Sequence, residues 1–471
     1  MVVELKTQLQ NLKGHTYWQW LFGTIASLGF LVYGLEAAWL SPTTKHLQSA
    51  DSPLGYPLSN SAISWIGSIN CFASAFFVIA FSYSADRFGR KWVVFAITIP
   101  VMLSILLRLF VPNIIALLIA RALAGSAASG VFVIIPMYIR ELSQTNLVGA
   151  TGSLNILLQN TGFLIMYLIG AYFEYYTVLW IYLTITILMA CLITLAPDSP
   201  AYLVKRGRLN EAYATVAFLR GRSIDDKEIK TEIEFMQQQE EQFKNQPKLS
   251  LKEIFKNKAW RRGFILLMAS WVTQTWNGSF AIVTYASIVL QATGSNLSIS
   301  PEIQSVSFPI IMIIASFTLT AIAERCGRKP LHAGAYLLSS IAHTGLGVSL
   351  LIQQTGYSIP SWLPILCMIL AVATYAGGVR SMPYIISVEL FNFQVRAKLL
   401  GLLHTFGWSS VSSQLFAFGP LVDSFGLHYT FILFGVINLL GACIAMFIPE
   451  TRRKTEEQVM GKLDKKRKCP S

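Results

Sequence analysis

Asp86-Arg87-Phe88-Gly89-Arg90-Lys91 directly follows a long apolar run, and Glu324-Arg325-Cys326-Gly327-Arg328-Lys329 follows another about 240 residues later. A second pair has nearly the same offset, since Pro197-Asp198-Ser199-Pro200 is matched by Pro449-Glu450-Thr451. The two halves of the chain therefore carry the same succession of motifs. Repeats of this kind within a strongly apolar chain are typical of a duplicated membrane protein.

The composition indicates that a lipid bilayer is the main solvent of the chain. Of 471 residues, 54% are apolar, 12% aromatic and only 13% charged, which excludes an ordinary soluble protein. A bilayer core about 30 Å thick needs about 20 apolar residues per helix. Twelve stretches meet this requirement: 18–41, 62–84, 92–111, 114–138, 149–170, 176–197, 262–290, 304–323, 331–353, 361–388, 398–421 and 427–448.

The distribution of basic residues predicts the orientation of the chain. The loops after the even-numbered stretches, together with both tails, hold 33 of the 37 lysine and arginine residues, whereas the loops on the other side hold only Lys45. Without the long central loop the count is still 19 against one. Because basic loops stay on the cytosolic side, both termini are expected in the cytosol. The net charge of +13 then indicates attraction to anionic lipid, and no nucleic-acid partner is expected.

The apolar stretches and the charge distribution divide the chain into four segments. Residues 198–261 are rich in Glu, Lys, Gln and Asp, which predicts short cytosolic helices between two membrane bundles. The expected organisation is an N-terminal six-helix bundle at 1–197, the connector at 198–261, a C-terminal six-helix bundle at 262–448 and a basic cytosolic tail at 449–471.

The motifs together resemble the sugar porter family of the major facilitator superfamily, over about residues 17–460. Within that family, Leu40-Ser41-Pro42 and Asn160-Thr161-Gly162 are most similar to the insect facilitated trehalose transporters. The resemblance implies an all-α membrane protein with twelve transmembrane helices in two pseudo-symmetric six-helix bundles. It also implies a carrier that moves trehalose or a hexose down its gradient across the plasma membrane by alternating access. The other motifs that carry the resemblance are Pro136-Met137-Tyr138-Ile139-Arg140-Glu141, Pro383-Tyr384 leading to Glu389, and Leu219-Arg220-Gly221.

Two clusters of charged residues are expected to form an inner gate. By the family resemblance, Arg87, Arg90 and Glu141 hold the first half shut on the cytosolic side in the outward-facing state. The second half supplies Arg325, Arg328, Glu389 and Arg396. One element departs from the family, because Val148-Gly149 stands where an Arg-Gly is expected; Arg140 is the candidate replacement cation. The alternative interpretation is that these are ordinary interfacial charges that reach toward water.

The solute site is expected between the halves, on helices 1, 4, 7 and 10. A sugar needs amides around aromatic faces, because each hydroxyl both donates and accepts hydrogen bonds. The family pattern Gln-Gln-x-Ser-Gly-x-Asn in helix 7 reads Gln274-Thr275-Trp276-Asn277-Gly278-Ser279-Phe280 here, so much of the usual hydroxyl recognition is absent. The candidate substrate-binding residues are Gln274, Thr275, Trp408, Tyr384, Gln159, Asn160 and Arg380.

Two positions suggest other chemistry. Arg380 stands in helix 10 where the family has a glycine, and a charge at bilayer depth needs a partner or a wet cavity. Glu36 in helix 1 is one residue later than the aspartate of proton-coupled relatives, and its expected partner is Arg121 or Arg380. Glu36 is a candidate proton site with Arg121, a fixed ion pair, or a residue at the outer mouth in water. The fixed ion pair is the preferred interpretation.

The sequence predicts no catalysis. It contains no Gly-rich Lys-Ser/Thr loop for phosphate and no recognisable nucleophile with its base, so neither an ATP-driven pump nor an enzyme is expected. No cofactor is expected, and the six cysteines lack the spacing of a zinc site and lie outside the outer loops. Asn296-Leu297-Ser298 in the outer loop after 262–290 predicts a glycan at Asn296.

Two alternatives to a facilitative sugar carrier follow from the altered motifs. The first is a carrier of another small organic solute, anionic or proton-coupled, which Arg380 favours. The second is a non-transporting solute sensor, which the eroded helix 7 pattern permits. A sensor more often has a long cytosolic tail, whereas only 20 residues follow Thr451. The expected partners are therefore a small solute and the lipid bilayer, and no oligomer is required.

Overall fold

The computed structural model describes residues 16–144, 146–245, 250–293, 301–357, 359–391, 393–452, 458 and 461. All statements about the structure refer to these residues, in which the chain is helical and forms no strand. Asn296, the predicted glycosylation site, and the side chain of Arg325 lie outside this description.

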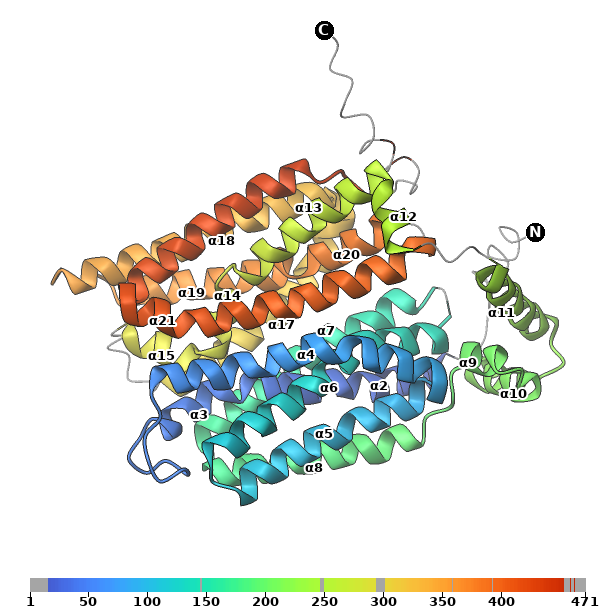
Figure 1. The fold of residues 1–471 in the computed structure, drawn as a ribbon, viewed down its shortest axis with the longest axis horizontal. Coiled ribbons are helices and arrows are strands. Elements are labelled where there is room, and N and C mark those ends of the chain that lie inside the picture. The colour runs from blue at the N-terminus through green and yellow to red at the C-terminus, as the bar shows by residue number, and fades with distance from the viewer. Residues whose placement is uncertain are drawn as a thin grey trace, which may run out of the picture.

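The N-terminal half forms one side of an elongated helical body (Figure 1). Its six spans run back and forth, because Gly89 and Asn113 start new helices immediately after short turns; Gly89 has φ +91°, a conformation that favours glycine. Its helices are α2 (Tyr17–Ala38), α3 (Leu40–Leu47), α4 (Asn60–Phe88), α5 (Arg90–Phe110), α6 (Ile114–Leu142), α7 (Val148–Tyr172) and α8 (Tyr175–Thr194).

The C-terminal half lies beside it and repeats the arrangement (Figure 1). Gly327 starts a helix in the same way as Gly89, with φ +94°. Its helices are α13 (Lys258–Thr275), α14 (Ser279–Thr284), α15 (Ala286–Ala292), α16 (Pro301–Ser305), α17 (Ser307–Cys326), α18 (Arg328–Gln354), α19 (Trp362–Thr374), the π-helix η1 (Tyr375–Val379), α20 (Ser381–Leu390) and α21 (Phe393–Phe447).

These helices make twelve membrane spans within the described residues. Nine helical segments are long and apolar enough to cross a membrane on their own. One of them, Lys398–Phe447, contains two spans, because the backbone of α21 reverses at Gly426 with φ +80°. The broken helix α13–α15 and the helix α17 supply the remaining two. The predicted all-α fold with two six-helix bundles is therefore confirmed.

The stretch 262–290 is not the single helix that the apolar run predicts. It is interrupted after Thr275 and resumes at Ser279, because Gly278 adopts φ +91° and its backbone lies against the ring of Phe434. The Asn277 side chain satisfies the freed polar groups. It donates to Ser339 Oγ at 3.0 Å and Asn438 Oδ1 at 2.9 Å, and accepts from the Ser279 amide at 2.8 Å. An interrupted helix at bilayer depth needs internal partners of this kind.

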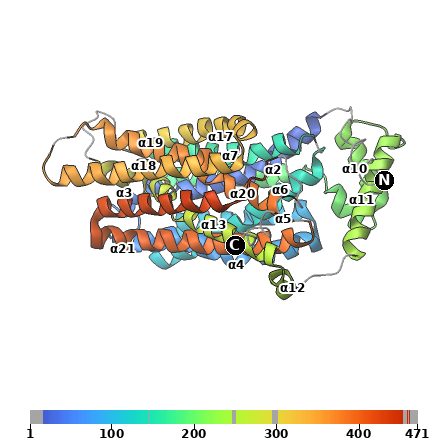
Figure 2. The ribbon, with the colours of Figure 1, turned by 90° about the horizontal axis from the view of Figure 1, so that it is seen from above.

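The connector helices lie at one end of the bundles, which we call the connector end (Figure 2). The opposite end, with residues 48–59, is the loop end (Figure 1). The helices α9 (Pro200–Lys205), α10 (Leu209–Arg220) and α11 (Lys227–Asn245) share a small apolar core, and α12 (Leu251–Lys256) leads into the second half. Arg220 binds Glu232 at 2.7 Å and donates to the Leu142 carbonyl at the end of α6. The connector is thus anchored to the first half.

Candidate functional site

A cavity lies between the two halves at about half the length of the spans. It is lined from the first half by α2, α6 and α7 and from the second half by α13, α14, η1, α20 and α21. Its volume is about 50 Å³, room for a few water molecules. The lining residues are Tyr33, Phe132, Gln159, Trp271, Gln274, Thr275, Phe280, Tyr375, Arg380, Tyr384, His404, Gly407, Trp408 and Val411.

Arg380 crosses this cavity from one half to the other. Its guanidinium donates to Oε1 of Gln159 on α7. The π-helix directs it there, because the Arg380 amide bonds to the Tyr375 carbonyl five residues earlier at 2.9 Å. In a π-turn, residues five apart lie above one another, whereas an α-helix aligns residues four apart. Tyr375 and Arg380 therefore face the same cavity.

The break between α13 and α14 positions two further polar residues of the cavity wall. Gln274 and Thr275 end α13 directly before the break, and Phe280 begins the lining beyond it. Thr275 is hydrogen-bonded to Ser410 at 2.6 Å. Gln274 is 6% exposed, and its Oε1 has no hydrogen-bond partner among the described residues. This amide oxygen is therefore an unused, buried acceptor on a residue that lines the cavity.

Aromatic rings form most of the remaining wall. Trp408 packs edge-on against Phe132 and Tyr33, with ring centroids 5.3 Å and 6.2 Å apart, so these rings join the two halves. Trp271 packs against Tyr384 at 4.5 Å on the opposite side. Such rings can cover the C–H face of a sugar. The wall thus combines apolar faces with a few polar groups.

Six of the seven sequence-predicted substrate residues line this cavity, and Asn160 does not. The Asn160 side chain is fully buried in α7, and neither of its polar atoms has a partner among the described residues. Sequence reasoning missed Tyr33, Phe132, Trp271, Tyr375 and His404. Four of these are aromatic residues on helices 1, 4, 7 and 10, which were the expected lining helices. Helical phase alone did not show which aromatic residues on those helices face inward.

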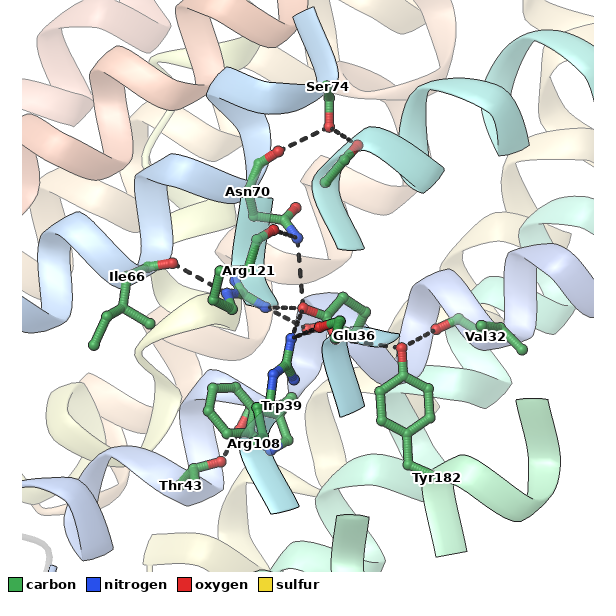
Figure 3. Close-up of polar contacts among 12 residues, drawn as sticks. Val32, Glu36, Trp39, Thr43, Ile66, Asn70, Ser74, Arg108, Arg121 and Tyr182 are labelled. Carbon is green, nitrogen blue, oxygen red and sulfur yellow. Dashed lines mark hydrogen bonds and ion pairs between the residues drawn. The ribbon is translucent and has the colours of Figure 1, made fainter. Parts of the chain in front are cut away.

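A second polar site lies within the first half, around Glu36 (Figure 3). Oε1 of Glu36 is 2.6 Å from Nη2 of Arg108 and 2.5 Å from Nη1 of Arg121. Tyr182 donates to Oε2 at 3.3 Å, and Glu36 is 2% exposed. The Trp39 ring covers Arg108, whose Cζ lies 4.3 Å from the ring centroid. One carboxylate therefore lies between two guanidinium groups in a dry environment.

The observed partners of Glu36 differ in part from the predicted ones. Arg121 is a partner, as expected. The position of Glu36 on its helix predicted a side chain that points away from Arg121, but the long glutamate side chain reaches the guanidinium. Arg121 also donates to the Glu36 carbonyl at 3.1 Å. Arg380 is not a partner, because it bonds to Gln159. The outer-mouth interpretation was wrong, since Glu36 is buried. Arg108 was missed; its signal was a second arginine at bilayer depth in the adjacent helix.

The duplicated motifs meet in one cluster at the connector end of each half. Glu141 binds Arg90 at 3.0 Å and accepts from Ser199, so all three motifs of the first half contribute. Glu389 binds Arg328 at 3.2 Å and accepts from Thr451, which is the counterpart of Ser199. Each cluster therefore joins the connector-end segments within its own half.

The other predicted gate residues take different positions. Arg140 is exposed, and among the described residues it contacts no carboxylate, so the structure does not place it in the cluster. The Arg87 side chain is exposed over the Phe88 ring, while its carbonyl accepts from Tyr202 and Arg206. Arg396 donates to the Phe391 carbonyl at 2.9 Å. Lys205 binds Asp86 at 3.1 Å beside the first cluster.

The two clusters differ in burial, which predicts unequal contributions to stability. The side chains of Arg90 and Glu141 are 8% and 14% exposed, against 13% and 30% for Arg328 and Glu389. We expect Glu141→Gln to lower the free energy of unfolding by about 1.5–3 kcal/mol, because it weakens hydrogen bonds to a buried charge. Glu389→Gln should cost about half as much. Unfolding of both variants in detergent tests this, and equal costs would contradict it.

The halves are also joined at the loop end. Ser287 on α15 donates to the Ser41 carbonyl on α3 at 2.7 Å, and Tyr167 on α7 donates to the Val283 carbonyl. Ser412 donates to the Ser68 carbonyl at 3.0 Å. These bonds join the two halves on the loop-end side of the cavity.

Known protein sequences are similar to this chain over most of its length. The family model described as sugar (and other) transporter matches residues 9–461. The facilitated trehalose transporter Tret1 of Bombyx mori is 24% identical, over 98% of this chain and 92% of that protein. Its counterpart in Culex quinquefasciatus is 25% identical, over 95% and 86%. The Aedes aegypti counterpart is 25% identical over 93% of this chain, which spans about half, 54%, of that protein.

Comparison with solved structures shows the same fold. The inward-open conformation of the xylose transporter XylE from E. coli superposes with a TM-score of 0.77 at 19% identity, over 93% of this chain and 98% of that chain. XylE bound to 6-bromo-6-deoxy-D-glucose gives a TM-score of 0.74 at 20% identity, over 95% and 100%. The helices described above therefore have the major facilitator arrangement.

Proposed function

Because the chain belongs to the sugar (and other) transporter family, we propose that it carries a sugar, trehalose or a hexose, across the plasma membrane by alternating access. The observation that carries this proposal is the cavity between the halves, where amides and aromatic rings from both bundles converge. A site shared by two repeats can open to either side when the repeats tilt against each other. The similar insect proteins are named facilitated trehalose transporters, which supports the choice of sugar.

The proposed orientation places the connector end in the cytosol and the loop end outside. The asymmetry of basic residues supports it, since Lys45 is the single basic residue in the loops assigned to the outside. With this orientation, the hydrogen bonds at Ser41 and Ser68 join the two halves on the outer side of the cavity. The two glutamate clusters then lie at the cytosolic surface, where they brace each half during tilting.

The proposed transport is facilitative. A carboxylate that couples transport to protons must gain and lose a proton during the cycle. Glu36 has two cationic partners within 2.6 Å, and both of these arginines come from its own half. Tilting of the halves therefore leaves the ion cluster unchanged. Glu36 acts as a fixed structural anchor rather than a proton carrier.

Transport by the purified protein in liposomes tests this function. Labelled trehalose and glucose are supplied with and without an inward proton gradient, and protein-free liposomes are the control. We expect uptake that stops at equal internal and external concentrations and has the same initial rate under both conditions. Accumulation above that level driven by the gradient would contradict the facilitative mechanism. A lack of any solute movement would contradict the carrier itself and favour a sensor.

A further inference from the structure

We infer that the preferred solute is a sugar acid, a monosaccharide-sized polyol that carries a carboxylate, and that Arg380 selects it. This inference rests on the proposed function, because it concerns the same cavity between the halves. It keeps the proposed carrier and its cavity, but assigns an anionic sugar derivative in place of a neutral sugar as the preferred substrate. Three features of the cavity wall support it: its charge, the unused acceptor of the lining residue Gln274, and the position of Arg380 between the halves.

The charge of the cavity is positive and uncompensated. Arg380 is the lining residue with a permanent charge, and no aspartate or glutamate is among the described lining residues. A guanidinium at bilayer depth has a partner or lines a wet cavity. Here its described acceptor is the neutral amide oxygen of Gln159. A carboxylate accepts the same N–H groups in charge-assisted bonds, which are stronger than bonds to an amide.

The remaining polar group of the wall fits the rest of such a solute. Oε1 of Gln274 is buried without a partner, and it can only accept a hydrogen bond. A solute hydroxyl donates to it, whereas a carboxylate cannot. Arg380 thus recognises an anion and Gln274 recognises a hydroxyl in the same cavity. The aromatic rings of Trp408 and Tyr384 cover the C–H surface between these two groups.

The position of Arg380 couples solute binding to movement of the halves. Its bond to Gln159 joins α7 of the first half to the segment that begins α20 of the second half. A solute carboxylate competes with Gln159 for the guanidinium. Binding therefore replaces a contact between the halves with a contact to the solute. The π-helix directs Arg380 into the cavity in this conformation, since the Arg380 amide bonds to the Tyr375 carbonyl.

The test compares labelled glucuronate with labelled glucose in liposomes held at zero membrane potential, so that charge alone does not drive uptake. We expect the wild-type protein to take up glucuronate about tenfold faster. Arg380→Gln is expected to lower that preference by about tenfold and so abolish it, which is within the size expected for a lost charge-assisted hydrogen bond. Arg380→Lys should retain part of the preference. Lys45→Gln, which removes an exposed cation at the loop end, is the control and should leave it unchanged.

Gln159→Glu provides an independent test, because it keeps the shape of the side chain and gives Arg380 an internal carboxylate. It should reduce the glucuronate preference as strongly as Arg380→Gln, although the arginine is still present. Quenching of the cavity tryptophans by glucuronate should be lost in both variants, while their melting temperatures in detergent show that they are folded. Glucose uptake without glucuronate uptake would overturn the inference and leave the proposed carrier intact. Movement of neither solute would overturn both.

Discussion

Replacing Glu36 with glutamine is expected to lower the free energy of unfolding by about 3–5 kcal/mol, the cost of leaving buried charges unpaired. The change removes the carboxylate that Arg108 and Arg121 share, while almost the same shape remains. Two guanidinium groups are then buried together without a counter-ion. The loss affects Arg108 more than Arg121, because Nε and Nη1 of Arg108 already lack hydrogen-bond partners in the described residues. Unfolding in detergent measures the loss.

Two matched variants separate the ion cluster from a general effect of lost charge. Glu174→Gln neutralises an exposed carboxylate in the same half, just before α8, and should change stability by less than about 0.5 kcal/mol. Glu36→Gln combined with Arg108→Gln removes one of the two cations and should recover part of the lost stability. If the double variant is less stable than Glu36→Gln alone, repulsion between the arginines is not the cause.

The fold could be predicted from the sequence because its signals are long and repeated. Twelve apolar stretches and a basic motif at the same place in each half constrain topology strongly, even where single boundaries are uncertain. The duplicated Pro197–Pro200 and Pro449–Thr451 motifs also indicated the ends of the bundles. Their hydroxyl contacts to Glu141 and Glu389 were not predicted. A motif identifies a position in the chain, but the residues that its side chains contact in the folded protein depend on packing.

The candidate site could be predicted only in part, because the direction of each side chain also depends on packing. Gln274, Thr275 and Arg380 were found because they occupy family positions on expected lining helices. Asn160 was predicted together with Gln159 as a polar residue of the same helix, but only Gln159 lines the cavity, because adjacent residues of a helix point about 100° apart. The break at Gly278 and the π-turn at Tyr375 change this helical phase locally. Neither can be read from hydropathy, which averages over whole spans.

The contact between α2 and α7 leads to the second large effect, which is expected for Gly162→Ala. A Cβ atom on Gly162 would lie 2.3 Å from the Leu31 carbonyl oxygen and 2.9 Å from Cα of Gly34. Both neighbours are backbone atoms, so no side chain can rotate away and the helices must separate. Small residues allow this close approach in membranes. The expected cost is about 1–3 kcal/mol, typical of an overpacked core.

The same substitution is expected to reduce transport, because α7 also carries Gln159. Separation of α2 and α7 moves Gln159 relative to Arg380, and misplacement of a positioning group by about 1 Å can lower a rate by about 100-fold. Gly152→Ala on the same helix is the matched control. Its Cβ would meet nothing within 4 Å, so it should stabilise the helix by about 0.5–1 kcal/mol and leave uptake unchanged. Equal behaviour of the two variants in unfolding and uptake would show that this glycine contact does not position the site.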